Sequence, residues 1–124
     1  MTNLERALDE KRAPWTGIEY RTEEFWVFKD AYPVTEGHLL FVPTQESMDC
    51  LWECYKAAYK YGHDGVIDKK WEGFNVGQNC GEVAGQTVMY PHVHMIPRRS
   101  GDMADPRGGV RHVIPEKGNY RVTK

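Results

Sequence analysis

The pattern of hydrophobic positions predicts five short strands between residues 18 and 96. Residues 18–21 and 25–29 are rich in aromatic and β-branched side chains, which is typical of strands. Residues 38–43 form an apolar run led by a histidine, and residues 73–77 form another short strand. In residues 88–96 the side chains alternate between the two faces that a strand would have. An Asp, Pro and Gly-containing turn separates the second and third segments, so we expect them to pair antiparallel.

The period of the hydrophobic positions becomes helical between residues 45 and 61. The apolar positions there predict one face that packs against the sheet, formed by Met48, Leu51, Tyr55 and Ala58. Gly62 follows directly, and helices often end in a left-handed glycine. We therefore expect one main helix that ends near Gly62.

A shorter helix is predicted at the start of the chain. Thr2 or Asn3 can cap it, and it extends through Glu10 with its apolar side chains on one side: Leu4, Ala7 and Leu8. Near the other end, residues 110–114 predict a short strand, in which His112 is a structural or surface residue. Together these segments predict an α+β fold, with a mostly antiparallel sheet and one main helix.

Length and composition limit the classes of function. With 124 residues, of which 40% are hydrophobic and 27% charged, the chain is long enough for one folded domain (residues 1–124) and too short for two. A net charge of −2 gives no basic field that would capture nucleic acid. No apolar run approaches the roughly 18 residues needed to cross a bilayer, and the charged segment 1–11 does not resemble a signal peptide.

The cysteines indicate a reducing compartment. Cys50, Cys54 and Cys80 are an odd number without paired spacing, which suits the cytoplasm. Cys50 and Cys54 would share one helix face as two ordinary half-buried thiols, because a structural zinc site needs a second ligand pair with suitable spacing. We therefore expect a cytoplasmic protein that binds neither membrane nor nucleic acid.

The candidate chemistry lies in the last predicted strand. His92 and His94 would point to the same face of residues 88–96, roughly 6.5–7 Å apart along the strand. Two imidazoles at this spacing can contact one bound group, such as a phosphate. A solvated face or an incidental metal site would have the same pattern. Pro91 lacks an N–H, so the strand cannot be fully paired there.

Several ordered blocks of the sequence resemble the histidine-triad, or HIT, family. The family signature is His-φ-His-φ-His-φ-φ, where φ is apolar, and residues 85–98 are similar to it. Residues 37–43 and 74–79 are similar to the family's other characteristic blocks. The resemblance covers residues 25–115, and residues 105–115 look most like bacterial dinucleoside-polyphosphate hydrolases of this family. It implies a HIT-like fold with a five-stranded sheet.

The resemblance implies a role for each residue at the triad positions. Aligned without gaps, the first position is Tyr90, the second His92 and the third His94. His92 would be the nucleophile that attacks an α-phosphorus, forming a nucleotidyl-histidine that water then cleaves. Its other ring nitrogen would donate to the backbone carbonyl of Tyr90. His94 would contact the phosphoryl oxygens or the leaving group and assist proton transfer, and His38 would complete the cluster from a neighbouring strand.

The departure at Tyr90 changes the hydrogen bonding that the first position can offer. A phenol stays protonated at neutral pH and cannot become a cation. It could still donate to a phosphate of the substrate or to His38.

The resemblance also implies a ribose and base subsite. Asp30 matches the residue that binds the ribose hydroxyls, although an Asp at this place also suits a loop cap. Phe28 and Leu40 match positions that line the base pocket, although both would serve equally well as core residues.

A phosphate subsite is implied in the same way. Asn79 and Gln86 match polar residues that hold the α-phosphate or ribose, and Thr87 could add a hydroxyl on the leaving-group side. Arg98 and Arg99 could attract a polyphosphate leaving group, although surface arginines are often merely solvated.

We therefore expect a HIT-type hydrolase or transferase acting at the α-phosphate of a purine nucleotide conjugate, either a dinucleoside polyphosphate or a nucleoside phosphoramidate. Because family members form dimers across the sheet, the resemblance implies a homodimer. It implies no cofactor and no metal, since imidazoles and amides would stabilise the phosphorus. Two alternatives remain: a catalytically weak nucleotide-binding sensor or adaptor, and metal binding by His38, His92 and His94.

Overall fold

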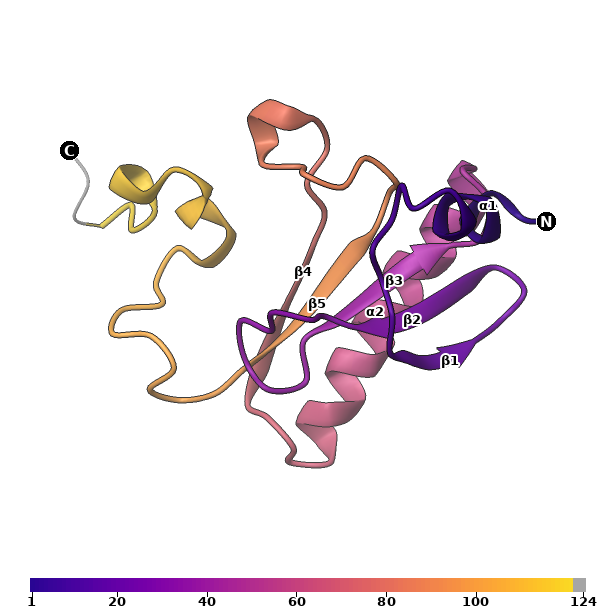
Figure 1. Cartoon of the computed structure of the whole chain (residues 1–124). Coiled ribbons are helices and arrows are strands. Elements are labelled where there is room, and N and C mark those ends of the chain that lie inside the picture. The colour runs from indigo at the N-terminus through magenta and orange to yellow at the C-terminus, as the bar shows by residue number, and fades with distance from the viewer. Residues whose placement is uncertain (122–124) are drawn as a thin grey trace.

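The computed structural model describes residues 1–121, which form an α+β fold around one five-stranded sheet (Figure 1). The strands are β1 (Ile18–Arg21), β2 (Phe25–Lys29), β3 (Leu39–Pro43), β4 (Gly73–Gly77) and β5 (Val93–Arg98). Their order in the sheet is β1-β2-β3-β5-β4, and all neighbouring strands are antiparallel. The predicted fold class is confirmed.

Two helices cover opposite faces of the sheet. The long helix α2 (Met48–Ile67) packs on the face to which Phe41, Val93 and Met95 point. The short helix α1 (Asn3–Asp9) lies on the other face, against Val42 and Tyr90. The histidine strand β5 therefore contributes one set of side chains to each side of the sheet.

Helix α1 begins as the sequence predicts. The Thr2 hydroxyl accepts from the Glu5 amide at 3.1 Å, and the Glu5 carboxylate accepts from the Thr2 amide at 2.9 Å. This reciprocal capping box satisfies two amide donors that the first turn would otherwise leave unpaired.

Helix α2 continues past Gly62, where we expected it to end, to Ile67. The glycines inside it allow aromatic rings to approach the helix closely. A Cβ at Gly62 would collide with the ring of Phe74, and a Cβ at Gly65 would collide with the indole of Trp71. The indole also donates to the Gly62 carbonyl at 2.8 Å. Gly62 therefore serves packing, and the expectation of a C-terminal glycine was wrong.

The predicted packing face of α2 is correct except at its first position. Ala58 is buried and Leu51 and Tyr55 pack on the core, but Met48 is 59% exposed. Met48 lies in the first turn of the helix, and its side chain remains in solvent.

Strand β5 is shorter at its start than the predicted segment 88–96, because backbone groups there are engaged elsewhere. The Gln86 side chain donates to the carbonyls of Val88 and Met89 at 3.1 and 3.0 Å. Pro91 has no N–H to contribute to the sheet. The strand therefore begins only at Val93, although the alternation of faces holds as predicted.

The segment after β5 contains short 3₁₀ helices, η2 (Gly109–Val113) and η3 (Pro115–Lys117), where we expected a strand at 110–114. Gly108 and Gly109 both have positive φ, 99° and 48°, and turn the chain into η2. This correction matters for the site because the segment folds back beside the sheet (Figure 1).

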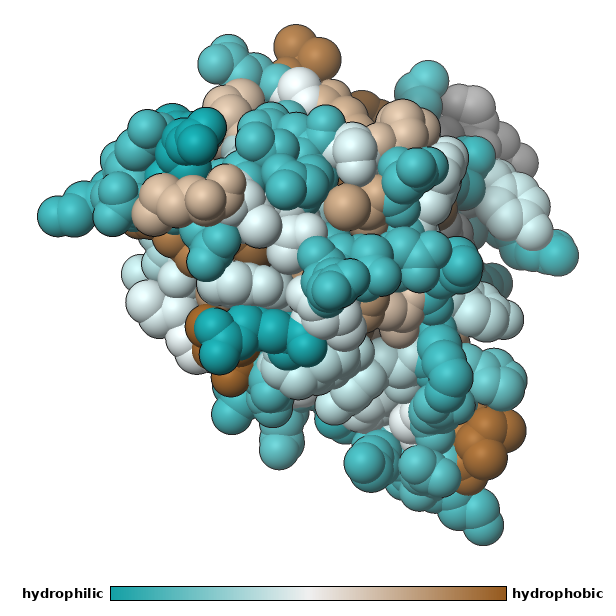
Figure 2. All heavy atoms as spheres, turned by 90° about the vertical axis from the view of Figure 1, so that its right-hand side faces the viewer, coloured by the Kyte–Doolittle hydropathy of each residue, from teal (hydrophilic) through white to brown (hydrophobic). Residues whose placement is uncertain are grey.

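The exposed face that contains α1 and the β1–β2 hairpin is mostly hydrophilic, with small separate hydrophobic areas (Figure 2). Within residues 1–121, none of the helices has the length and apolar character to span a membrane. The three cysteines are free thiols, with Cys50 half-buried, Cys54 buried and Cys80 exposed.

Candidate functional site

Three histidines meet on the face of the sheet opposite α2. His38 directly precedes β3, His92 directly precedes β5, and His94 is the second residue of β5. His94 lies opposite Leu40 in the β3–β5 register. The ring centroids of His94 lie 5.1 Å from His38 and 5.2 Å from His92. The structure thus brings together the three predicted catalytic residues.

The tautomer of His92 follows from its hydrogen bond. Its Nδ1 lies 2.8 Å from the backbone oxygen of Tyr90, and a carbonyl can only accept, so Nδ1 donates its proton. In the neutral ring, Nε2 then has the free lone pair. His92 is therefore oriented as a nucleophile or acceptor at Nε2.

The tautomers of His38 and His94 follow from a second backbone group. The Val34 amide donates to Nδ1 of His38 at 3.1 Å, so the proton of neutral His38 is on Nε2. That nitrogen lies 2.9 Å from Nδ1 of His94, which must accept. The remaining proton of His94 is therefore on its Nε2, where it can serve as a donor. The cluster thus offers a lone pair on His92 beside an N–H on His94.

The environment keeps the His38–His94 pair neutral. Burial, together with the positive charges that His92 and His38 could acquire, lowers the pKa of His94 to about 4. Burial also lowers the pKa of His38, and the Asp30 carboxylate partly opposes this. Both rings are consequently neutral near pH 7, which is the state that the tautomers above require.

Asp30 lies beside the histidines and also caps its own loop. Its Oδ1 accepts from the Tyr32 amide at 2.8 Å, and its Oδ2 lies 3.4 Å from Nε2 of His38. The loop-cap alternative is therefore observed, while the ribose contact stays a prediction.

Asp30, His38 and His94 are close enough to hold a metal ion, with one ligand atom of each within 4.8 Å of the others. The hydrogen bond from Val34 disfavours such a site. It places the proton of His38 on Nε2, the nitrogen that would have to bind the metal. This set also differs from the alternative based on His38, His92 and His94.

Tyr90 contributes to the site through its backbone. Its hydroxyl donates to the Pro43 carbonyl at 2.6 Å, and its side chain is only 3% exposed. Burial raises the pKa of this phenol well above its usual range. We expected the hydroxyl to donate to a phosphate or to His38, but in this structure it donates to the Pro43 carbonyl instead.

The two residues expected in the base pocket are core residues in this structure. Phe28 is 1% exposed and Leu40 is 3% exposed, both in the cluster beneath α1. The ring of Trp15 covers this region, 5.9 Å from the Phe28 ring and 4.9 Å from the His92 ring. Sequence reasoning missed Trp15. The only available signal was an aromatic residue directly after Pro14, which does not indicate where the loop leads.

The phosphate-side residues lie in the loop between β4 and β5. Gln86 stabilises this loop, because its Oε1 accepts from the Gly81 amide at 2.8 Å and its amide donates to two carbonyls. Asn79 is half-buried and Thr87 is exposed in the same loop. Their contacts with a phosphate remain predictions.

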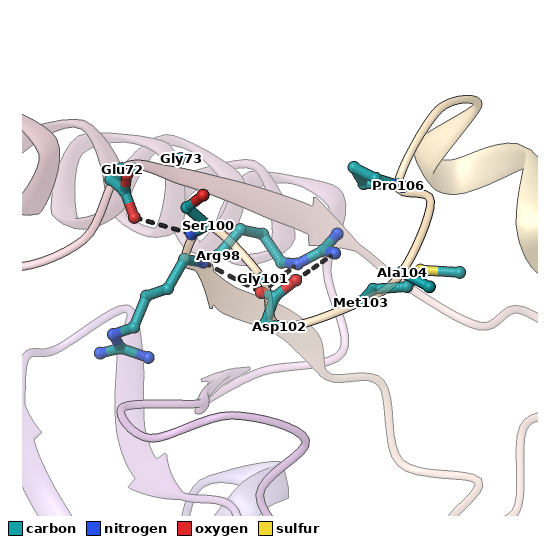
Figure 3. Close-up of a pocket in the computed structure, with 10 residues that line it drawn as sticks. Glu72, Gly73, Arg98, Ser100, Gly101, Asp102, Met103, Ala104 and Pro106 are labelled. Atoms are coloured by element: carbon teal, nitrogen blue, oxygen red, sulfur yellow. Dashed lines mark hydrogen bonds and ion pairs between the residues drawn. The ribbon is translucent and has the colours of Figure 1, made fainter.

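The two arginines after the histidines contact the protein itself. Arg98 donates to Asp102 through Nε and Nη2, both at 2.9 Å (Figure 3). It also donates to Asn75 through Nη1 at 2.8 Å. Arg99 donates to the Glu36 carbonyl at 2.9 Å. Arg98 is thus paired with an acid, whereas the role of either arginine toward a polyphosphate stays a prediction.

With the fold and the histidine cluster described, comparison with known proteins identifies the family. The model of the HIT domain matches residues 16–101. The structure also superposes on a zinc-bound histidine triad family protein of Mycobacterium smegmatis with a TM-score of 0.67, at 25% identity over 82% of this chain and 78% of that one. The chain belongs to the HIT family.

Two enzymes are among its relatives. A bis(5'-nucleosyl)-tetraphosphatase of Schizosaccharomyces pombe is 30% identical over 71% of this chain and 52% of its own length. An adenosine 5'-monophosphoramidase of Saccharomyces cerevisiae is 32% identical over 63% of this chain and 51% of its own length. The chain spans about half the length of each of these enzymes. Both of these relatives are enzymes that act on nucleotides.

Proposed function

We propose that this protein is a nucleotide hydrolase or transferase that acts at the α-phosphate of a purine nucleotide conjugate. The observation on which the proposal rests is the 2.8 Å bond from Nδ1 of His92 to the Tyr90 carbonyl. It leaves a lone pair on Nε2 of a ring whose centroid lies 5.2 Å from that of His94, the ring with its N–H at Nε2. The conjugate would be a dinucleoside polyphosphate or a nucleoside phosphoramidate.

In the first step, the Nε2 lone pair of His92 attacks the α-phosphorus and the bond from phosphorus to the leaving group breaks. The Nε2–H of His94 donates to a phosphoryl oxygen, where negative charge increases in the transition state. The Tyr90 carbonyl stabilises the proton on Nδ1 as the ring becomes positively charged. The product is a nucleotidyl-histidine and a free leaving group, which departs as an anion when it is a polyphosphate and takes up a proton from solvent when it is an amine.

In the second step, water attacks the same phosphorus and the bond to Nε2 of His92 breaks. The water loses a proton to solvent or to the leaving imidazole, and a nucleoside monophosphate is released. In a transferase, another nucleophile takes the place of water. Splitting one displacement into two lowers each barrier.

A homodimer is part of the proposal. Three side chains on α2, Met48, Trp52 and Tyr59, are 59%, 53% and 61% exposed and form a stripe at helical spacing. Tyr59 packs edge-on against Phe74 of β4, at 5.6 Å between ring centroids. The stripe therefore borders β4, an edge strand of the sheet. An apolar surface beside an edge strand suits pairing with a second copy.

The covalent step is tested by mass spectrometry of protein quenched during turnover with diadenosine tetraphosphate or an adenylate phosphoramidate. We expect a nucleotidyl adduct on His92, with release of AMP. The variants His92→Ala and His92→Gln should lose the adduct and at least roughly 10³-fold in turnover, because the nucleophile itself is removed.

His63→Ala is the matched control, since His63 is an exposed histidine on α2 outside the cluster. It should behave as wild type. Circular dichroism shows whether each variant is folded. Turnover without an adduct, or with an adduct on another residue, would contradict the mechanism.

The alternative is a nucleotide-binding sensor with weak or no catalysis. The position of Trp15 favours it, because its ring packs against that of His92 with 4.9 Å between the centroids, and His92 is only 8% exposed. Tight binding of the nucleotide, with neither adduct nor product, would support this alternative over the enzyme.

A further inference from the structure

One aromatic side chain from outside the sheet packs on the proposed nucleophile. The centroid of the Trp15 indole lies 4.9 Å from that of the His92 ring. It also lies 5.9 Å from the centroid of Phe28 and 6.2 Å from that of Tyr90. These three rings are buried, whereas Trp15 is half-buried. Trp15 is therefore the most exposed ring of the group.

Trp15 belongs to a short connection between α1 and β1, which crosses the sheet beside the start of β5 (Figure 1). We call residues 14–16 the Trp15 strap. The chain is fixed on both sides of it. The Ala13 amide donates to a carbonyl of α1 at 3.3 Å, and the Gly17 carbonyl accepts from the Lys29 amide of β2 at 3.1 Å. The strap is thus a short span between two anchored points.

Between these points the strap is held by the packing of the indole. Pro14 has no N–H, and both Pro14 and Thr16 are exposed. In the part of the chain that the structure describes, no protein hydrogen bond joins the backbone of residues 14–16 or the indole N–H to another group. Short exposed segments with few contacts are the parts of a protein that open most readily. Lifting the indole therefore breaks ring contacts and leaves α1 and the sheet intact.

The position of the indole conflicts with attack by His92. A displacement at phosphorus needs the phosphorus about 3–3.5 Å from the attacking Nε2, with room for the phosphoryl oxygens around it. Three groups enclose His92: the Tyr90 carbonyl at Nδ1, the His94 ring and the indole of Trp15. The first two belong to the proposed catalytic machinery. The indole is therefore the group that has to move.

The apolar surface under the indole is suited to a purine. Phe28, on which the indole packs, is one of the two residues expected in the base pocket. An indole and a purine are both flat bicyclic aromatic systems, so they compete for the same ring contacts. A purine nucleotide can replace the contacts that the indole gives up, whereas a phosphoryl compound without a base cannot.

On the basis of the proposed function, we infer that Trp15 is an autoinhibitory latch on His92, which a purine nucleotide displaces by placing its base on Phe28. In the free protein the latch is closed, and the nucleophile is shielded from small phosphoryl compounds. When a nucleotide binds, part of the binding energy of its base is used to expose Nε2 of His92. Recognition of the base and exposure of the nucleophile are thereby coupled.

The first test measures the exposure of His92 without any substrate. Diethyl pyrocarbonate carbethoxylates neutral imidazoles at a nitrogen with a free lone pair, and mass spectrometry maps the modified residues. We expect His92 to react about tenfold faster in Trp15→Ala, which corresponds to a strap that is open in roughly one wild-type molecule in ten. The exposed His63 is the internal standard and should react equally in both proteins.

Trp26→Ala is the matched control. Trp26 packs in the same cluster, with its ring centroid 6.3 Å from that of Phe28, and among the described residues it has no ring contact with His92. Its removal should leave the reaction of His92 unchanged, although it also takes an indole from the cluster. Circular dichroism shows whether each variant is folded. Trp15→Leu, whose shorter side chain keeps an apolar contact, replaces Trp15→Ala if the alanine variant does not fold.

The second test measures the affinity for AMP by calorimetry. A latch that must open reduces the apparent affinity by the fraction of open molecules, so Trp15→Ala should bind AMP roughly tenfold more tightly than wild type. Trp26→Ala should not bind it more tightly. An indole that stacked on the bound base would give the opposite sign, because its removal would weaken binding.

The outcomes separate the latch from the proposed function. An unchanged reaction of His92 in Trp15→Ala, or an affinity for AMP that does not rise, overturns the latch even if wild-type protein forms the His92 adduct. Faster carbethoxylation together with tighter AMP binding supports the latch even if no adduct forms, in which case only the enzyme proposal fails.

Discussion

The tautomers of the histidine cluster are determined by two backbone groups. The Tyr90 carbonyl fixes the proton of His92 on Nδ1, and the Val34 amide fixes that of His38 on Nε2. Because Nε2 of His38 donates to Nδ1 of His94 at 2.9 Å, the tautomer of His38 also determines that of His94. Three identical side chains thereby acquire different roles.

The buried, neutral state of His94 makes stability dependent on pH. The unfolded chain binds a proton on His94 near the ordinary pKa of 6.5, but the folded chain does so only near 4. Between these values the unfolded state binds more protons, so the free energy of unfolding falls as pH decreases from 6.5 to 4, and this contribution is fully present above 6.5. His38, whose pKa is also lowered, acts in the same direction.

Urea unfolding at several pH values checks this prediction, and NMR should show His94 titrating with a midpoint near 4. A His94→Gln variant, which cannot titrate, should lose less stability over the same window. Parallel stability curves for wild type and variant would contradict the assignment.

At the residue scale, the sequence predicted which histidines lie together better than it predicted the residues around them. The alternation of residues 92–96 was sufficient to place His92 and His94 on one face. The roles of Val34 and Trp15 could not be predicted, because each depends on how a loop folds onto residues distant in the sequence. Almost every residue has a backbone amide, so the residue types do not indicate which amide will contact a histidine.

Among the elements, α2 depends on two glycines that a helix would normally disfavour. Gly62 and Gly65 allow Phe74 and Trp71 to pack against the helix backbone. Alanine is favoured over glycine in a helix interior by about 1 kcal/mol. Overpacking a core costs about 1–3 kcal/mol.

We therefore predict that Gly65→Ala lowers the free energy of unfolding by roughly 1–2 kcal/mol, despite the better helix propensity of alanine. The Cβ would displace the Trp71 indole and weaken its hydrogen bond to the Gly62 carbonyl. Urea denaturation measures the change. His63→Ala on the exposed side of the same helix should have little effect, and a Gly65→Ala protein as stable as wild type would show that the indole can move at no cost.

The boundaries of elements were predictable where local patterns decide them. β1, β2 and β4 begin and end at the predicted residues, and Thr2 caps α1 as expected. The end of α2 and the start of β5 were not, because they depend on the aromatic residues that pack on Gly62 and Gly65 and on the amide of Gln86. The strand predicted at 110–114 failed because Gly108 and Gly109 adopt left-handed conformations that direct a 3₁₀ helix.

For the molecule as a whole, the exposed stripe on α2 predicts self-association. Trp52→Glu should convert the proposed homodimer to a monomer, because it puts a charge at the centre of the apolar stripe. Sedimentation equilibrium measures the mass. Tyr32→Glu, at an 89% exposed site in the loop after β2, should leave it unchanged. A wild-type protein that sediments as a monomer at high concentration would contradict the dimer.

The loop between β2 and β3 determines which ring nitrogens of His38 and His94 have a proton, because it contains the amide of Val34. An insertion or deletion in that loop would withdraw the amide from Nδ1 of His38 and allow the opposite tautomer. The hydrogen bond between the rings would then reverse, and His94 would present a lone pair to a phosphate where it now presents a proton. A chain with all three histidines intact would then lack the donor on His94 that the proposed reaction requires.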